Sequence, residues 1–275
     1  MEVRPMLETD IRVSSNVRRD FVLAVDSGLY WPFALLSGGL LRGYAEAELV
    51  FHATRGMTVR VNSFFGDVSF ALPLLEVVEE RARRLRCRAL YVSSGPDTPE
   101  LSEAAVTAAF DRLDETVMTR FTNFMTIFSQ PSAAMIRPMD PGEYCRVRSR
   151  LIPLISHGEF VATKDEVAIR MRSGGYRPFV AVRDGSILGY AENNLHHAWL
   201  RRTQFMRVER VVVAPEVRGR GIASDLVATL IQDAFCAACT SIELQTHSDN
   251  ASAIRVYERL GFQKTNGILF AKTIS

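Results

Sequence analysis

An internal repeat constrains the fold of this chain more than any other feature of its sequence. Residues 30–49 align with residues 176–195 at a constant offset of 146 (176 − 30), and nine of the twenty aligned pairs are identical. Each copy has the pattern of a β-hairpin, and Asp184-Gly185 is a strong turn signal in the second copy. Because a hairpin repeated in both halves indicates a duplication, we predict two related domains in these 275 residues.

The repeat extends more weakly along both halves of the chain. Val3–Met6 resembles Ile136–Met139, and in each half the hairpin is followed by a strand, a helix, a strand, a helix and closing strands. In the first half we predict these elements at 57–65, 74–85, 88–92, 100–113 and 117–128. In the second half we predict them at 207–213, 223–237, 241–245, 250–260, and 262–264 with 268–274. We therefore predict α/β domains at 1–131 and 132–275, with a short linker at 129–133.

The segment 209–223 in the second half predicts an anion-binding site. The β-branched run Val211–Val213 indicates a buried strand, and Pro215 ends it because proline cannot donate to a sheet ladder. A helical pattern begins at Ile222, so the free N–H groups of its first turn favour an anion. The loop between them supplies charge and backbone freedom. Its candidate binding residues are Arg218, Gly219, Arg220, Gly221, Ile222 and Ala223.

Two interpretations of this loop are possible from its spacing. Gly219-x-Gly221-x-x-Ser224 departs from the dinucleotide fingerprint only at its last position, and Glu243 lies near the place of a ribose-binding acid. The alternative spacing, Arg218-x-x-Gly221-x-Ala223, resembles the R/Q-x-x-G-x-G/A pyrophosphate loop of the GNAT superfamily of N-acyltransferases.

A second motif downstream supports the resemblance to this family. Asn250-x-x-Ala253-x-x-x-Tyr257-x-x-x-Gly261-Phe262 matches N-x-x-A-x-x-x-Y-x-x-x-G-F at the usual distance. Two ordered matches are far more specific than one, and the resemblance covers residues 134–275. With the repeat, it implies an α/β (α+β) fold of two tandem GNAT-like domains. Each domain would be a mixed, mostly antiparallel sheet flanked by helices.

The resemblance also implies a donor site for acetyl-CoA as co-substrate. The loop would hold the pyrophosphate, and the pantetheine arm would bond to the backbone of the fourth strand near Val211, Val212 and Val213. One of these N–H groups would polarise the thioester carbonyl. Asn250 would contact the donor, cap the following helix, or do both.

Acyl transfer to an amine needs an acid and a base. Tyr257 is the predicted general acid for the departing thiolate, since an ordinary tyrosine is neutral at pH 7. Glu209 is the predicted general base, and strand alternation would place it on one face with Val211 and Val213. The rival bases are Glu192, Glu243 and His247.

The acceptor site is predicted less sharply. In this family the helices here predicted at 142–157 and 164–172 commonly shape it, with the loop before the fourth strand. The residues expected to line it are Glu143, Tyr144, Glu159 and Phe160. Adjacent histidines in a strand point to opposite faces, so we predict that His196-His197 bind no metal, and no metal cofactor is expected.

The first half has lost the residues that carry this chemistry. Its loop, Phe65-Gly66-Asp67-Val68-Ser69, has one glycine and no arginine, and Asp67 would repel a phosphate. Where Tyr257 and Gly261-Phe262 belong it offers Ala109, Phe110 and then Leu113-Asp114-Glu115, and Phe110 could fill the place of a tyrosine in packing but has no proton to donate. We therefore interpret residues 1–131 as a degenerate copy.

Composition excludes several classes of function. The net charge is +2, which does not favour nucleic acid or a membrane surface, and no apolar run is long enough to span a bilayer. The four cysteines are few and scattered, which indicates reduced thiols and a cytoplasmic location. Cys236 and Cys239 are predicted to be small buried residues of a helix. The sequence is compatible with an oligomer.

These observations predict an acetyl-CoA-dependent N-acetyltransferase that acts directly, through a tetrahedral intermediate, on a primary amine of a small molecule. Two alternatives stay open. In the first, the protein is an acyltransferase whose acyl donor is the phosphopantetheine arm of a carrier protein. In the second, the chain is a non-catalytic acyl-CoA-binding or sensing protein.

Overall fold

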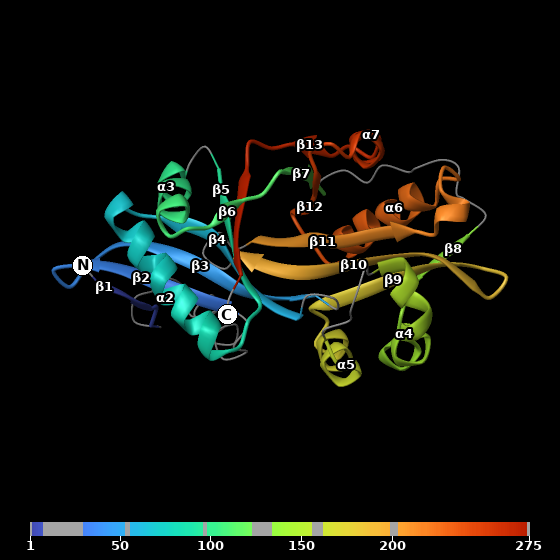
Figure 1. The fold of residues 1–275 in the computed structure, drawn as a ribbon, viewed down its shortest axis with the longest axis horizontal. Helices are drawn as coiled ribbons and strands as arrows, with labels where there is room; N and C mark the ends of the chain where they lie inside the picture. Colours follow the sequence, from blue (N-terminus) through green and yellow to red (C-terminus); the bar gives the residue numbers. More distant parts are fainter. Residues whose placement is uncertain are drawn as a thin grey trace. The chain divides into compact units, whose positions relative to one another are not determined.

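The computed structural model describes residues 2–7, 30–52, 56–95, 98–122, 134–155, 162–198 and 203–273. The chain forms two compact units. The first consists of Met1–Val50, Gly56–Glu115 and Asn266–Ser275, and the second of Phe51–Arg55 and Thr116–Thr265. In the described part of the chain each unit is built on a seven-stranded sheet flanked by helices, so the α/β prediction is confirmed (Figure 1).

The first sheet contains one parallel pair, β4 with β5, and antiparallel pairs on both sides of it. In spatial order its strands are β1 (Glu2–Pro5), β2 (Tyr30–Ser37), β3 (Leu40–His52), β4 (Gly56–Phe65), β5 (Ala89–Ser94), β14 (Ile268–Thr273) and β6 (Asp111–Arg112). Its helices are the short 3-10 helix η2 (Val68–Phe70), α2 (Ala71–Arg84) and α3 (Pro99–Thr107).

The second sheet has the same arrangement, with β11 and β12 as its parallel pair. In spatial order its strands are β8 (Met135–Pro138), β9 (Tyr176–Arg183), β10 (Ser186–Ala198), β11 (Thr203–Val213), β12 (Ser241–His247), β7 (Glu115–Phe121) and β13 (Gln263–Lys264). Its helices are α4 (Pro141–Ile155), α5 (Lys164–Arg172), η3 (Pro215–Val217), α6 (Ile222–Cys236) and α7 (Ala251–Arg259). Helices α6 and α7 cover one face of the sheet, and α4 and α5 cover the other (Figure 1).

The two halves exchange their last long strands. β7 precedes the second half in the sequence but lies between β12 and β13, and β14 lies between β5 and β6. Matching backbone hydrogen bonds hold the exchanged strands in both sheets. Leu113 N donates to Leu269 O and Thr265 N donates to Val117 O, each at 2.9 Å. The compact units therefore differ from the linear division at residue 131 that the repeat predicts.

Local signals explain several element boundaries. Gly38-Gly39 and Asp184-Gly185 have positive φ angles at both turn positions, as a tight hairpin turn requires. Thr163 and Glu166 form a reciprocal capping box that begins α5. The predicted helix 100–113 is wrong beyond Thr107, because Ala109 turns to φ 58 and ends the helix.

Each unit has its own hydrophobic core, and the core of the second unit lies between its sheet and α6. Leu226 and Leu230 of α6 are fully buried with Ala191 and Met206 of the sheet. Met118 of the exchanged strand β7 is also fully buried in this core. Burying a side chain of this size contributes about 2 kcal/mol, so β7 is part of what stabilises the second unit.

Candidate functional site

The central strands of the second sheet separate part-way along their length. Parallel pairing of β11 with β12 runs from Phe205–Ser241 to Val208–Leu244. Both strands continue, to Val213 and to His247, yet over these described residues they no longer pair. The separation leaves the end of β11 with a free edge in the middle of a sheet, where an extended ligand has backbone groups to bond.

A β-bulge lies where the separation begins. On the other side of β11, Arg210 pairs with Glu192 and Val208 with Asn193, so Glu209 is an extra residue in the strand. The bulge reverses the alternation beyond it. Val211 and Val213 pack on the core beneath α6, whereas Glu209 lies on the opposite face. The prediction that these three residues share a face is therefore wrong.

Glu209 is a buried carboxylate with defined partners. Its side chain is 5% exposed, Asn194 Nδ2 donates to its Oε1 at 3.3 Å, and His196 Nε2 lies 3.9 Å from the same oxygen. His196 in turn stacks on the ring of Phe205, with the centroids 5.0 Å apart. Glu209 is therefore not an exposed carboxylate at the end of its strand. Asn194 and His196 were not predicted as its neighbours, because only the register of β10 against the bulge brings them together.

The rival base Glu192 is fully buried on the same face in a closed cluster. Tyr176 and Tyr190 donate their hydroxyl groups to its Oε2, and Arg210 Nε donates to its Oε1 at 3.3 Å. Burial raises the pKa of Glu192, opposed by the charge of Arg210 and the hydroxyl of Tyr176. Because three neighbours already bind this carboxylate, it is less available to a substrate amine than Glu209.

The other two rivals lie on β12. Glu243 accepts a hydrogen bond from Arg207 Nη2 at 3.2 Å, and its side chain is 27% exposed. His247 is an exposed residue at the end of the strand, beyond the last pair with β11. Neither belongs to the Asn194–Glu209–His196 group, so the structure places the four candidates in four different environments.

The glycine loop has the geometry of an anion site. Gly219 and Gly221 adopt φ 76 and 84, values that other residues rarely take, and Gly221 immediately precedes α6. Glycine has no side chain to cap the helix, which leaves first-turn N–H groups such as those of Ile222 and Ala223 for a ligand. Arg218 and Arg220 are exposed, and Arg218 Nε donates to Val213 O at 3.1 Å.

The second motif lies on α7. Burial raises the pKa of Tyr257 to about 12, and its ring packs at 6.0 Å from that of Phe262. The hydroxyl of Tyr257 therefore holds its proton more firmly than that of an ordinary tyrosine. Asn250 caps α7, because its side chain accepts from Ala253 N at 3.3 Å.

The first unit lacks the donor loop because the connection between its two parallel strands is shorter. Val59 and Met206 occupy equivalent rungs of the parallel ladders, an offset of 147 (206 − 59), whereas Leu90 and Ile242 differ by 152 (242 − 90). The connection in the first unit is therefore five residues shorter (152 − 147). Its Asp67 carboxylate accepts from Ser69 N at 2.9 Å, and this bond lowers the pKa of Asp67. Asp67 thus caps the short helix η2, as Ala214 precedes η3 in the second unit, and it supplies no counterpart of the glycine loop.

The counterpart of Tyr257 in the first unit needs a correction. Phe110 N donates to Ala105 O and Phe262 N donates to Tyr257 O, at 2.9 and 3.0 Å. The matching bonds align Phe110 with Phe262. They align Ala105 with Tyr257, so Phe110 is not the counterpart of Tyr257. Ala105 is fully buried and carries no proton donor, so the first unit has no equivalent of the predicted acid.

The carboxylate of the base is also replaced in the first unit. Asn62 Nδ2 donates to Glu48 Oε2 at 2.7 Å, in the place where Asn194 donates to Glu209. Amide and carboxylate have changed strands between the two units. Val50 stands where the second unit has His196. At these matching positions, the Asn–Glu–His group is therefore present in the second unit and not in the first.

The predicted acceptor residues are divided by the structure. Glu143 forms a bidentate ion pair with Arg137, at 2.6 Å for both bonds, which indicates a structural role. Tyr144 is fully buried on α4, close enough to Glu192 for that charge to raise its pKa further, burial being the main cause. Glu159 and Phe160 lie outside the described residues.

The metal and cysteine predictions concern side chains away from this site. Among the residues that the structure describes, no three His, Cys, Asp or Glu side chains are grouped to hold a metal ion. His196 and His197 both lie within β10. Cys239 is buried, but Cys236 is exposed, so the prediction of two buried thiols is half wrong.

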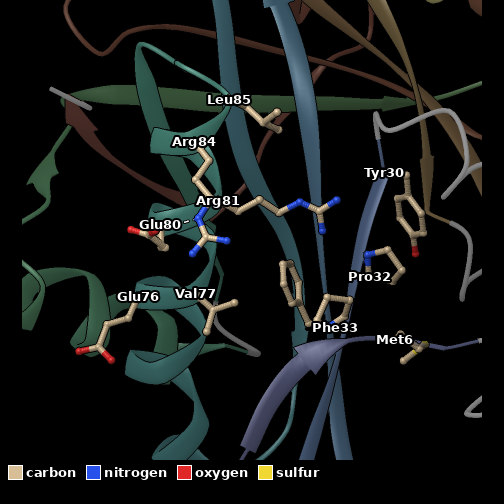
Figure 2. Close-up of a pocket in the computed structure, with 11 residues that line it drawn as sticks. Met6, Tyr30, Pro32, Phe33, Glu76, Val77, Glu80, Arg81, Arg84 and Leu85 are labelled. Atoms are coloured by element: carbon tan, nitrogen blue, oxygen red, sulfur yellow. Dashed lines mark hydrogen bonds and ion pairs between the residues drawn. The ribbon is translucent and has the colours of Figure 1, made fainter.

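A groove of about 850 Å³ lies in the first unit, between its N-terminal strands and α2. Figure 2 shows Arg81 and Val77 of α2 on the side that faces Pro32 and Phe33 of β2. The groove contains none of the motif residues, so it lends no support to a second donor site.

None of the helices in the described part of the chain is long and apolar enough to cross a membrane.

Residues 151–262 match the family model described as the acetyltransferase (GNAT) family. The chain is similar to aminoglycoside N(6')-acetyltransferase type 1 of Salmonella typhimurium, 26% identical over 95 residues, which cover 34% of this chain and 66% of the relative. It is also similar to mycothiol acetyltransferase of Brachybacterium faecium, 31% identical over 90 residues, which cover 30% of this chain and 25% of the relative. The chain thus spans less than two thirds of the length of these two relatives.

Two solved structures match the whole chain. A GCN5-related N-acetyltransferase from Sphaerobacter thermophilus superposes with a TM-score of 0.63 at 15% identity, covering 99% of this chain and 95% of that chain. A tandem GNAT protein from the clavulanic acid biosynthesis pathway superposes with a TM-score of 0.56 at 18% identity, covering 100% and 98%. At this identity the likeness concerns the fold, which is a tandem GNAT architecture.

Proposed function

We propose, from the premise that the chain belongs to the GNAT acetyltransferase family through residues 151–262, that its second unit transfers an acetyl group from acetyl-CoA to a primary amine of a small molecule. The observation that carries the proposal is the separation of β11 from β12 beyond Val208–Leu244. It leaves backbone groups free beside a buried carboxylate and next to a helix N-terminus. These are the features that an extended, phosphate-bearing thioester donor requires.

In this proposal each group of the site has one task. The first turn of α6, with Arg218 and Arg220, holds the pyrophosphate. Glu209 removes a proton from the acceptor amine, which then attacks the thioester carbonyl. Backbone N–H groups of Val211–Val213 stabilise the oxyanion as the new C–N bond forms. Tyr257 protonates the thiolate that leaves when the C–S bond breaks.

The names of the two curated relatives suggest a small-molecule acceptor. One is described as acting on an aminoglycoside and the other on mycothiol, and both names specify acetyl transfer. We propose that this chain likewise acts on a small amine, without a nucleic-acid, membrane or metal requirement. Its four unpaired cysteines suit a reducing compartment, so we propose a cytoplasmic location.

The proposal is tested by substituting Glu209, the buried carboxylate at the bulge. Glu209→Gln keeps the size and the contact with Asn194 but cannot take a proton. We expect kcat/KM at neutral pH to fall about 10²- to 10⁴-fold, with unchanged acetyl-CoA affinity. The measurement is thiol release from acetyl-CoA with a panel of amines, together with calorimetric binding of the donor.

The matched control is Glu48→Gln in the first unit. It removes the carboxylate of the corresponding amide–acid pair, where Asn62 bonds Glu48. We expect no change in turnover from this control. Equal losses in the two variants, or an unchanged rate in Glu209→Gln, would contradict the role of Glu209 as base.

A further inference from the structure

Arg207 of β11 is a buried cation whose guanidinium is only partly hydrogen-bonded. The residue is 4% exposed, its Nη2 donates to Glu243 at 3.2 Å, and it lies over the ring of Phe205 at 5.1 Å. Its Nε and Nη1 are shielded from solvent and have no hydrogen-bond partner in the described structure. A guanidinium carries five donors, and buried donors are nearly always bonded. The missing acceptors therefore point to a bound group that completes the site.

Arg207 lies close to the proposed base and to the point where the two strands separate. It pairs with Asn194 on one side and with Glu243 on the other, one residue before β11 and β12 separate. It is also two residues before Glu209, and side chains two residues apart on a strand share a face at roughly 6–7 Å. An acceptor amine that reaches Glu209 would thus have the part of its body a few bonds away close to Arg207.

The first unit shows what has changed around this arginine. Arg60 occupies the equivalent rung, paired with Tyr91, and is buried at 3% exposure. Beside it the β3 position that matches Asn194 is Glu48, a carboxylate. In the second unit that position is a neutral amide. The carboxylates near Arg207 are instead Glu243, which accepts from Nη2, and Glu209 two residues along the strand, so Nε and Nη1 are the donors that remain for an added anion.

We infer that Arg207 binds an anionic group of the acceptor, so that the acceptor is a primary amine that also carries a carboxylate or phosphonate a few bonds from its nitrogen. This inference rests on the proposed function, because it identifies the substrate class of the same site. Arg207 is a specificity-determining residue in this scheme. Guanidinium suits such groups because it binds carboxylates and phosphates through paired N–H donors.

The test compares three amines of similar length with acetyl-CoA as donor: 4-aminobutanoate, 3-aminopropylphosphonate and the neutral 4-aminobutanamide. We expect the native enzyme to prefer at least one anionic amine to the amide. Arg207→Gln should raise KM for that amine about 10- to 100-fold, with little effect on the amide. Arg207→Lys should restore part of the preference. The carboxylate and phosphonate arms identify which anion is used.

Arg60→Gln is the matched control, since it removes the buried arginine from the same rung of the first sheet. It should keep the preference for the anionic amine. If Arg207→Gln lowers the rates with all three amines equally, or if the native enzyme prefers the amide, Arg207 is a structural residue and the inference is overturned.

Failure of the proposed function gives a different result. In that case no amine is acetylated by the native protein, and calorimetric binding of the two anionic amines replaces the kinetic measurement. Weaker binding to Arg207→Gln than to the native protein still supports an anion site. Equal binding to both, or no binding, overturns it.

Discussion

Glu209 and Asn62 occupy the same place at the separation of two equivalent strand pairs, but only Glu209 is a carboxylate. In the second unit the acid lies on the bulged strand and receives its hydrogen bond from Asn194, and His196 lies beside it. In the first unit the acid, Glu48, is on the adjoining strand. One exchange of residues between neighbouring strands therefore moves the carboxylate toward or away from the free edge where an acyl donor would lie.

Tyr257 gives a prediction about proton transfer. Burial raises its pKa to about 12, so the protonated acid persists in alkaline solution to a higher pH than an ordinary tyrosine. We expect kcat to stay flat from pH 7 to pH 10 as far as this residue is concerned, and Tyr257→Phe to lower kcat about 100-fold. Donor affinity should change little. An alkaline limb below pH 10 that disappears in Tyr257→Phe would contradict this account.

Arg218 distinguishes free CoA from a carrier protein as the donor. Its exposed guanidinium is held at the loop by the bond to Val213 O. Arg218→Ala should raise KM for acetyl-CoA about tenfold, since one charge-assisted contact to the pyrophosphate is lost. The KM for acetyl-pantetheine, which lacks that pyrophosphate, should not change. Equal sensitivity of both donors would favour a structural role for Arg218 and leave a carrier-bound donor open.

At the scale of elements, the exchanged strands explain why a half without the motifs is retained. β7 comes from the first half of the sequence, yet it lies between β12 and β13 and buries Met118 in the core of the second unit. Gly261 of the second motif, with φ 85, packs closely against Arg120 of the same strand. The chemistry of the second unit therefore depends on a strand that precedes it in the chain.

This dependence predicts how fragments of the chain behave. Residues 116–265 contain β7 and nearly all of the second unit, whereas residues 132–275 follow the sequence repeat and lack β7. We expect the first fragment to unfold cooperatively on heating and the second to be unfolded or aggregated, because its sheet has a gap beside β12. Circular dichroism during thermal unfolding measures the difference. A stable, cooperative 132–275 fragment would show that β7 is dispensable.

At the scale of the whole molecule, local patterns predicted most elements and long-range pairing was missed. The hairpins, α5 and α6 follow from turn residues, capping and helical spacing, and the structure confirms them within three residues. The strand exchange could not be predicted, because the local sequences of β7 and β14 do not determine which of the two sheets each strand joins. The bulge at Glu209 was missed for a similar reason, since it depends on register with β10 and not on the sequence of β11 alone.

The central claim is that one unit binds acetyl-CoA and the other has lost its donor loop. Calorimetric titration of the purified chain with acetyl-CoA tests it most directly, because it counts sites. We predict one site per chain, lost in Arg218→Glu/Arg220→Glu and kept in Arg42→Glu/Arg88→Glu, which makes the same charge change on exposed residues of the first unit. Two sites, or one site that survives reversal of the loop charges, would contradict the account.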